Sequence, residues 1–316
     1  MPANAILVAN TEWAPEPWAE AARLAAPDRP VFIWPDVPEP EAVAYALSWK
    51  PAPGALLGLP NLRIIFSLGA GVDHLIFNRD LPDAPIVRVV SDNLTERITE
   101  WVVLQVLLHH RRQREYDALQ RDRRWHELRQ PAASEMRVGI MGMGVLGRSA
   151  ARVLVQLGFQ AAGWSRRPAE VEGVQPFVGG EALDAFLART DILVSLLPLT
   201  AETRGILSMP LFEKLAHDGR TGKPVLINAG RGGLQIEADI VAALDAGILG
   251  GASLDVFEHE PLDATSPLWL YDSVVITPHC AAWSSPEALV PAMLKQIAAF
   301  EAGEPLTHVV DRTSGY

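Results

Sequence analysis

The sequence has few of the features that mark secreted or membrane proteins. It contains a single cysteine, Cys280, among 316 residues, so no disulfide can form within the chain. This scarcity indicates a reducing compartment, and we expect a cytoplasmic protein. No uninterrupted apolar run reaches the length of a membrane span, and the N-terminus lacks the basic and apolar regions of a secretory signal. We therefore expect no membrane partner.

Positive charge is also scarce. Lys and Arg number 27 against 38 Asp and Glu, which gives a formal charge of −11. A surface that binds nucleic acid needs clustered positive charge, so we expect no nucleic-acid partner. The arginine-rich segment 111–129 is interleaved with acidic residues, which is typical of a solvated helix face or a subunit contact.

Short apolar runs alternate with helical patterns along the chain. The expected strands are 5–8, 31–33, 45–48, 64–67 and 86–89, then 161–164, 192–196, 225–228, 252–254 and 274–276. Helical periodicity covers 18–25, a long segment from 95, then 145–157 and 286–302. Because such alternation is typical of parallel sheets covered by helices, we predict an α/β fold of two doubly wound parallel-sheet domains.

The most informative motif is a glycine-rich loop between a strand and a helix. The apolar run 136–141 leads into Gly-x-Gly-x-x-Gly, and a helical pattern follows. The first glycine permits a tight turn, the second lets a pyrophosphate approach the backbone, and the third lets the helix pack on the strand. The anion would lie at the helix N-terminus, where the dipole favours it. We therefore predict a nicotinamide dinucleotide site that includes Gly142, Gly144, Val145, Leu146 and Gly147.

The end of the next strand indicates which dinucleotide is bound. An enzyme that binds NAD usually carries Asp or Glu about twenty residues after the glycines, where it binds the ribose 2′-hydroxyl. Here that place holds Ser165, Arg166 and Arg167, whose hydroxyl and cations suit a 2′-phosphate. We predict that NADPH is preferred over NADH; a solvated arginine pair is the alternative.

Further motifs follow in a fixed order. They are Asn228-Ala229-Gly230-Arg231-Gly232-Gly233, Leu254-Asp255-Val256-Phe257-Glu258-His259-Glu260-Pro261-Leu262 and Thr277-Pro278-His279-Cys280-Ala281-Ala282. With these motifs the chain resembles the D-isomer-specific 2-hydroxyacid dehydrogenase family across nearly its whole length. Within that family it is most similar to the glyoxylate/hydroxypyruvate reductase A group, on the added segments 67–73, 163–166, 266–269 and the terminal Asp-Arg-x-x-Gly-Tyr of 311–316.

The resemblance implies a domain organisation. A Rossmann-type cofactor domain would cover residues 97–287. A flavodoxin-like substrate domain would be assembled from residues 1–96 and 288–316. Relatives form homodimers through the cofactor domain, so a homodimer is expected.

The resemblance also assigns chemistry to three residues of the motifs. Arg231 would offer its planar fork to the carboxylate of a 2-oxo acid. His279 would give a proton to the ketone oxygen as hydride reaches the carbon, and Glu260 would orient His279 and favour its imidazolium form. The alternatives are a salt-bridged surface arginine, a helix-capping glutamate and a core histidine.

Other contacts are implied around these three residues. Asp255 would hold the nicotinamide carboxamide or, alternatively, cap the next turn, and Cys280 is interpreted as a small apolar filler. Trp49 and Trp283 would line the substrate pocket, although core packing is the commoner fate of a tryptophan. The remaining cofactor contacts would be Leu197, Pro198, Asn228, Ala229, Gly230 and Ala281, and the remaining substrate contacts Leu68, Gly69, Ala70 and Gly71, whose loop presents backbone amides.

These implications describe an NADPH-preferring reductase that converts glyoxylate and hydroxypyruvate to glycolate and D-glycerate. Two alternatives stay open. Another small 2-oxo acid could be the substrate, because one sequence does not fix the volume of a pocket. The chain could instead be a dinucleotide-sensing scaffold of the corepressor type, although the intact set of Arg231, Glu260 and His279 favours an enzyme.

Overall fold

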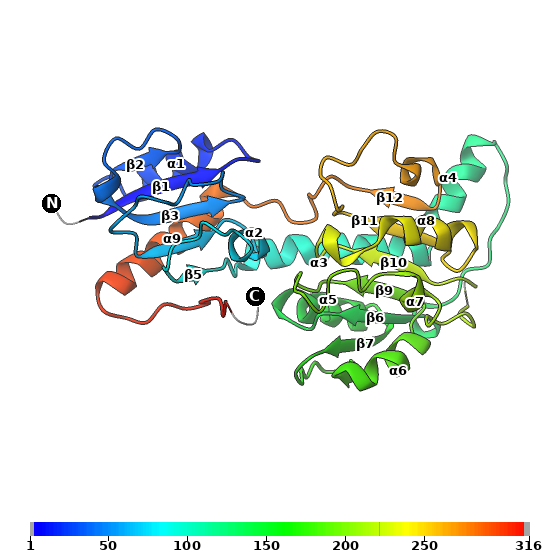
Figure 1. The fold of residues 1–316 in the computed structure, drawn as a ribbon. Helices are drawn as coiled ribbons and strands as arrows, with labels where there is room; N and C mark the ends of the chain where they lie inside the picture. Colours follow the sequence, from blue (N-terminus) through cyan, green and yellow to red (C-terminus); the bar gives the residue numbers. More distant parts are fainter. Residues whose placement is uncertain (1–2, 221, 313–316) are drawn as a thin grey trace. The chain divides into compact units, whose positions relative to one another are not determined.

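A computed structural model describes residues 3–220 and 222–312 (Figure 1). Packing divides the chain into two compact units. We call them the terminal unit, Met1–Leu94 with Trp283–Tyr316, and the central unit, Thr95–Ala282. The domain boundaries expected from the sequence were after residues 96 and 287. They lie two and five residues beyond the boundaries of these units, which follow Leu94 and Ala282. In the described ranges no helix is long and apolar enough to cross a membrane.

A parallel sheet forms the centre of the terminal unit. Within residues 3–94 and 283–312 it has five strands in the order β2-β1-β3-β4-β5. This is the flavodoxin-like order, in which the strand sequence reverses between β1 and β3. The strands are β1 (Ala5–Asn10), β2 (Val31–Ile33), β3 (Val43–Trp49), β4 (Ile64–Ser67) and β5 (Ile86–Val87), and the helices are α1 (Glu16–Ala25), α2 (Asp73–Ile76) and α9 (Pro286–Glu301).

The last helix, α9, is joined to the N-terminal strands by polar contacts. Glu301 accepts a hydrogen bond from the Tyr45 hydroxyl at 2.8 Å and pairs with Arg29 at 2.5 Å. The Arg29 guanidinium lowers the pKa of the Glu301 carboxyl. Segments from the two ends of the chain therefore share one core, whose strands β1, β3 and β4 are buried throughout.

A second parallel sheet forms the centre of the central unit. Among its described residues the sheet has seven strands, in the order β12-β11-β10-β9-β6-β7-β8, with a reversal between β6 and β9. The strands are β6 (Arg137–Met141), β7 (Gln160–Ser165), β8 (Gln175–Val178), β9 (Ile192–Ser195), β10 (Val225–Asn228), β11 (Gly251–Leu254) and β12 (Val274–Ile276). The predicted α/β class with two doubly wound parallel sheets is confirmed.

Helices flank this second sheet (Figure 1). They are α3 (Asp92–His110), α4 (Gln113–Arg121), α5 (Val145–Gln156), α6 (Leu183–Ala188), α7 (Met209–Phe212) and α8 (Glu237–Asp245). Both faces of the sheet are covered, which is why β9, β10 and β11 consist entirely of buried residues.

A polar network joins α3 to β11. The Ser253 hydroxyl donates to Gln105 Oε1 at 2.8 Å, and His109 Nε2 lies 2.8 Å from Ser253 Oγ. Because Ser253 gives its only proton to Gln105, His109 Nε2 carries a hydrogen and donates it to Ser253. Burial, and less strongly the positive charge of Arg114, lowers the pKa of His109 to about 4. His109 is therefore neutral in the folded protein near neutral pH.

This neutral histidine should make stability depend on pH. An unfolded histidine has a pKa of about 6.5, so the unfolded chain takes up the proton first as pH falls. The stabilisation is complete above about pH 6.5 and is lost progressively towards pH 4. Between about pH 7 and pH 5 the parent should lose roughly 2 kcal/mol more unfolding free energy than His109→Gln, measured by urea unfolding. Equal losses in the two proteins would contradict this role of His109.

Candidate functional site

The residues expected to bind the cofactor lie in loops at one edge of the seven-stranded sheet. Because all its strands are parallel, the loops that follow them at their carboxyl ends meet at the same edge. The glycine loop follows β6, the serine–arginine segment ends and follows β7, and the Leu197-Pro198 pair follows β9. The Arg231, Glu260 and His279 motifs follow β10, β11 and β12, which are neighbours in the sheet.

The three glycines of the loop after β6 differ in their surroundings. Gly142 has a φ of +101°, and a Cβ there would lie 2.7 Å from the Leu196 carbonyl oxygen. A Cβ at Gly147 would lie 2.0 Å from the Gly142 carbonyl oxygen, so α5 packs directly on the turn. A Cβ at Gly144 would meet nothing within 4 Å. The open backbone at Gly144, at the start of α5, fits the approach of a pyrophosphate.

The end of β7 carries positive charge in place of a carboxylate. The Ser165 hydroxyl donates to the Arg167 carbonyl oxygen at 2.6 Å, which closes a turn. The side chains of Arg166 and Arg167 are exposed. The hydroxyl proton therefore serves the turn, and the two guanidinium groups are the groups suited to a phosphate.

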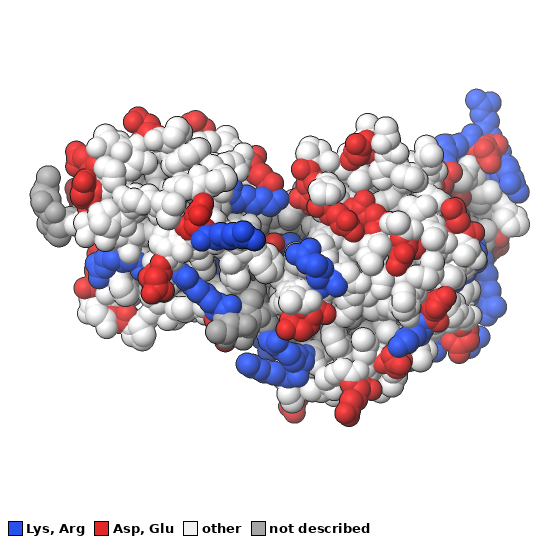
Figure 2. Space-filling view, in the orientation of Figure 1, with Lys and Arg blue, Asp and Glu red and all other residues white. Residues whose placement is uncertain are grey.

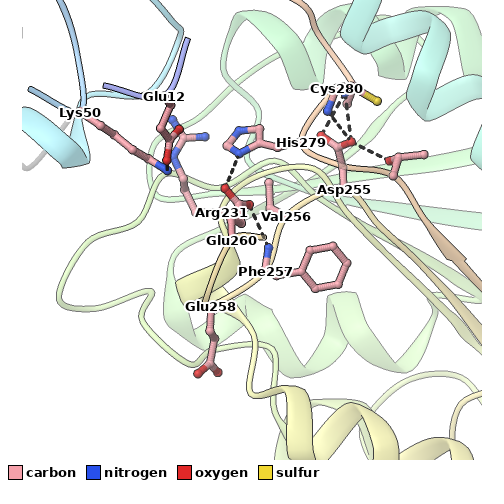
Figure 3. Close-up of polar contacts among 12 residues, drawn as sticks. Glu12, Lys50, Arg231, Asp255, Val256, Phe257, Glu258, Glu260, His279 and Cys280 are labelled. Atoms are coloured by element: carbon pink, nitrogen blue, oxygen red, sulfur yellow. Dashed lines mark hydrogen bonds and ion pairs between the residues drawn. The ribbon is translucent and has the colours of Figure 1, made fainter. Parts of the chain in front are cut away.

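His279 and Glu260 are hydrogen-bonded to each other in the central unit (Figure 3). His279 Nδ1 lies 2.9 Å from Glu260 Oε2, and Glu260 Oε1 accepts from the Phe257 N–H at 3.1 Å. An ionised carboxylate only accepts hydrogen bonds, so Nδ1 carries a hydrogen and Nε2 is the ring nitrogen that remains for proton transfer.

The backbone at His279 has an unusual conformation. Its φ is +51°, in the left-handed region that non-glycine residues rarely adopt. The His279 N–H donates to the Asp255 carbonyl oxygen at 2.7 Å, which holds this turn in place. Strained backbone of this kind persists where surrounding structure fixes it, and it is frequent at functional sites.

The Asp255 carboxylate binds the turn that contains His279. Oδ1 accepts from the Thr277 hydroxyl at 2.6 Å and from the Cys280 N–H at 2.9 Å, and both oxygens accept from the Ala281 N–H. These bonds support the alternative in which Asp255 caps the turn, while its contact with nicotinamide stays a prediction. Cys280 is exposed, so its interpretation as an apolar filler was wrong.

The Arg231 loop packs tightly against its neighbours. A Cβ at Gly232 would lie 1.8 Å from the Phe257 carbonyl oxygen, and one at Gly230 would lie 2.8 Å from the Leu197 carbonyl oxygen. Arg231 Nη1 donates to the Gly230 carbonyl oxygen at 2.7 Å. The loops after β9, β10 and β11 are therefore in direct backbone contact, which fixes where the Arg231 side chain begins.

In the terminal unit Trp49 ends β3 and is only 4% exposed. Its ring stacks on that of Trp13, with ring centroids 4.9 Å apart. The His74 ring lies against it at a tilt, with ring centroids 4.3 Å apart. A Cβ at Gly69 would lie 2.5 Å from the same Trp49 ring, so Gly69 packs directly on Trp49. Trp283, the other tryptophan expected at the substrate, is 61% exposed. Sequence reasoning missed Trp13 and His74, because nothing in their local pattern shows that they contact Trp49.

The terminal motif of 311–316 is described only in part. Arg312 donates to the carbonyl oxygens of Pro82 and Ala84 at 2.7 and 2.5 Å, which ties this segment to the terminal unit. Residues 313–316 lie outside the described residues.

Comparison with known proteins identifies the family. Residues 103–281 match the model of the family described as D-isomer specific 2-hydroxyacid dehydrogenase, NAD binding domain. The chain belongs to the D-isomer specific 2-hydroxyacid dehydrogenase family. This dehydrogenase is therefore an NAD(P)-dependent oxidoreductase with a Rossmann-type central unit, and the resemblance seen in its sequence is confirmed.

Relatives of this dehydrogenase match along nearly their whole length. The glyoxylate/hydroxypyruvate reductase A of Escherichia fergusonii is 39% identical over 313 residues, which cover 97% of each chain. A Sinorhizobium meliloti structure described as an NADPH-dependent glyoxylate/hydroxypyruvate reductase with NADP and sulfate is 49% identical, with a TM-score of 0.95 over 99% of this chain and 100% of that one. A probable 2-hydroxyacid dehydrogenase of Rhizobium etli with NADP, HEPES and tartaric acid is 50% identical, with a TM-score of 0.93 over 99% of each.

Proposed function

We propose that this dehydrogenase reduces glyoxylate to glycolate and hydroxypyruvate to D-glycerate with NADPH. The observation that carries the proposal is the arrangement of Arg231 and the His279–Glu260 pair on neighbouring loops, at the sheet edge that also carries the glycine loop. The similarity to reductases of this specificity supports the choice of substrate.

The proposed mechanism follows from the chemistry of a 2-oxo acid. Arg231 binds the carboxylate through its planar fork, and the amides of Ala70 and Gly71 bind the carboxylate oxygens further. Glu260 orients His279 through Nδ1, so that Nε2 can give its proton to the ketone oxygen. NADPH, when bound, supplies the hydride that reduces the ketone carbon. Proton transfer from His279 neutralises the charge that would otherwise develop on the oxygen.

The remaining predicted contacts are part of the proposal. The walls of the substrate site are Trp49, Leu68, Gly69 and Trp283. The cofactor contacts are Gly142, Gly144, Val145, Leu146, Gly147, Ser165, Arg166, Arg167, Leu197, Pro198, Asn228, Ala229, Gly230, Asp255 and Ala281.

We expect cofactor preference to depend on Arg166 and Arg167. A charge-assisted hydrogen bond to a phosphate contributes roughly 1.5–3 kcal/mol. Because the two side chains are exposed, screening by solvent and salt reduces this free energy. We therefore expect kcat/KM to be about 10- to 1,000-fold higher with NADPH than with NADH. Replacing both arginines with alanine should raise the KM for NADPH and leave that for NADH nearly unchanged, and higher salt should have the same effect on the parent. The measurement is kcat/KM for both cofactors at fixed glyoxylate, and an unchanged cofactor ratio would refute the assignment.

A panel of 2-oxo acids tests the substrate. Initial rates of NADPH oxidation should be highest with glyoxylate and hydroxypyruvate among small 2-oxo acids. A higher kcat/KM for a different 2-oxo acid would replace the proposed substrate but keep the reaction. No turnover with any of them, together with tight NADPH binding, would favour the dinucleotide-sensing scaffold.

We also propose a homodimer formed through the central unit. Trp125, Trp269 and Leu270 of this unit are 105%, 51% and 85% exposed, and a subunit interface would remove such apolar side chains from water. Arg121 pairs with Asp272 at 2.8 Å, which joins α4 to the turn beside Leu270. Figure 2 shows basic side chains around α4 with acidic ones among them, and both signs are mixed over most of that face. Sedimentation of the purified full chain tests the assembly.

A cytoplasmic location stays a prediction that rests on the cysteine content.

A further inference from the structure

Two buried side-chain amides lie beneath the Arg231 loop. Asn228 ends β10 and is fully buried, and Gln235 follows the 3₁₀ turn Gly232–Leu234 and is 1% exposed. Asn228 begins the motif that contains Arg231. Gln235 lies just after that motif, between Leu234 and Ile236, and is not among the predicted cofactor or substrate contacts. Buried amides need hydrogen-bond partners, and the partners of these two define a connected path.

The first part of the path fixes the backbone around Arg231. Asn228 Oδ1 accepts from the Gly230 N–H at 3.1 Å, and Asn228 Nδ2 donates to the Arg231 carbonyl oxygen at 3.1 Å. Asn228 Nδ2 also donates to Gln235 Oε1 at 2.8 Å. The Asn228 side chain therefore holds the Ala229–Gly230 peptide group, one residue before Arg231, and the Arg231–Gly232 peptide group after it, and it also donates to Gln235.

The second part of the path reaches His279. Gln235 Nε2 donates to the Val256 carbonyl oxygen at 3.0 Å. That oxygen belongs to the same peptide group as the Phe257 N–H, which donates to Glu260 Oε1 (Figure 3). A hydrogen bond accepted by the oxygen of a peptide group polarises it and strengthens its N–H as a donor. Glu260 Oε2 in turn accepts from His279 Nδ1.

We propose that Gln235 is a positioning residue that joins the Arg231 loop to the Glu260–His279 pair. Through it, the group that binds the carboxylate and the group that gives the proton are held in one geometry. The two loops are already in backbone contact at Gly232 and Phe257, and the Gln235 amide supplies the buried polar connection between them. The inference rests on the proposed function, since it assigns a role in that reaction.

Two substitutions at Gln235 and one matched control test the inference. Gln235→Met keeps the length of the side chain and removes both of its hydrogen bonds. Gln235→Glu keeps an acceptor for Asn228 and removes the donor to Val256. The control is Gln105→Met, because Gln105 is 2% exposed, accepts a hydrogen bond from Ser253 and lies outside the path.

The kinetic result should separate positioning from general loss of stability. Since small misplacements of reacting groups are costly, we expect kcat for glyoxylate to fall roughly 10- to 100-fold in both Gln235 variants. The KM for NADPH should stay close to that of the parent. Gln105→Met should lose thermal stability to a similar extent but keep the parent kcat. A kcat equal to the parent's in both Gln235 variants would overturn the inference.

A spectroscopic readout makes the test independent of turnover. The His279 Nδ1–H proton, hydrogen-bonded to Glu260, should give a downfield proton resonance that disappears in His279→Asn. We expect this resonance to move upfield or broaden in Gln235→Met and Gln235→Glu, and to stay in place in Gln105→Met. If the parent reduced no 2-oxo acid, the proposed function would fail, while an unmoved resonance in the Gln235 variants would refute the connection itself.

Discussion

Replacing His279 with alanine is expected to lower kcat for glyoxylate reduction on the order of 10²- to 10⁴-fold, the usual contribution of a positioned general acid. Nδ1 of this histidine is held by Glu260 at 2.9 Å, so Nε2 is the proton-donating atom that the substitution removes. NADPH affinity, measured by fluorescence titration, should be retained, because the glycine loop lies after β6 and His279 after β12.

A matched control accompanies this variant. His217 is an exposed histidine of the same unit whose Nε2 lies 3.3 Å from the Glu213 carbonyl oxygen, and His217→Ala should keep the parent kcat. A His279→Ala enzyme within about threefold of the parent would remove His279 from the mechanism, since a general acid contributes far more.

Arg231→Lys is expected to be nearly as damaging as Arg231→Ala. A guanidinium gives two parallel hydrogen bonds to a carboxylate, and an ammonium group cannot reproduce that geometry. With roughly 1.5–3 kcal/mol for each charge-assisted bond, loss of both should lower kcat/KM for glyoxylate by about 10²- to 10⁴-fold. The measurement is kcat/KM for the parent, the two Arg231 variants and Arg220→Lys, an exposed arginine of the same unit that should be unaffected.

The substrate offers a second control for Arg231. The amide of glyoxylic acid lacks the carboxylate charge, so the parent should reduce it poorly, and the Arg231 variants should show little further loss with it. Equal turnover of acid and amide by the parent would show that Arg231 does not recognise the carboxylate.

Much of the fold could be predicted because its strands are short, buried and apolar. The expected bounds of β2, β4, β10 and β12 are those observed, since turn residues border each run. β8 was missed because its residues, Gln175–Val178, lie mostly exposed at the edge of the sheet and show no apolar alternation. β5 is shorter than expected and ends at Val87.

The site shows the same division between local and distant information. The glycine loop and the order of the later motifs are local patterns, and the family resemblance that rests on them indicated Arg231, Glu260 and His279. Contacts between loops that follow different strands leave no local pattern in the sequence. The bond from Gln235 to Val256 and the stacking of Trp13 on Trp49 are of this kind. Gln235 stands between two apolar residues in the stretch 234–236. This placement is a weak sequence signal that could have indicated a buried hydrogen bond such as the one to Val256.

Hydride transfer to a 2-oxo acid can be followed most directly with NADPH that carries deuterium at C4 of the nicotinamide ring. The two stereospecifically labelled forms are each incubated with the enzyme and glyoxylate, and the product is analysed by mass spectrometry. We expect glycolate with one deuterium at C2 from one labelled form and unlabelled glycolate from the other. Glycolate without deuterium from both forms, or no glycolate at all, would contradict the proposed reaction.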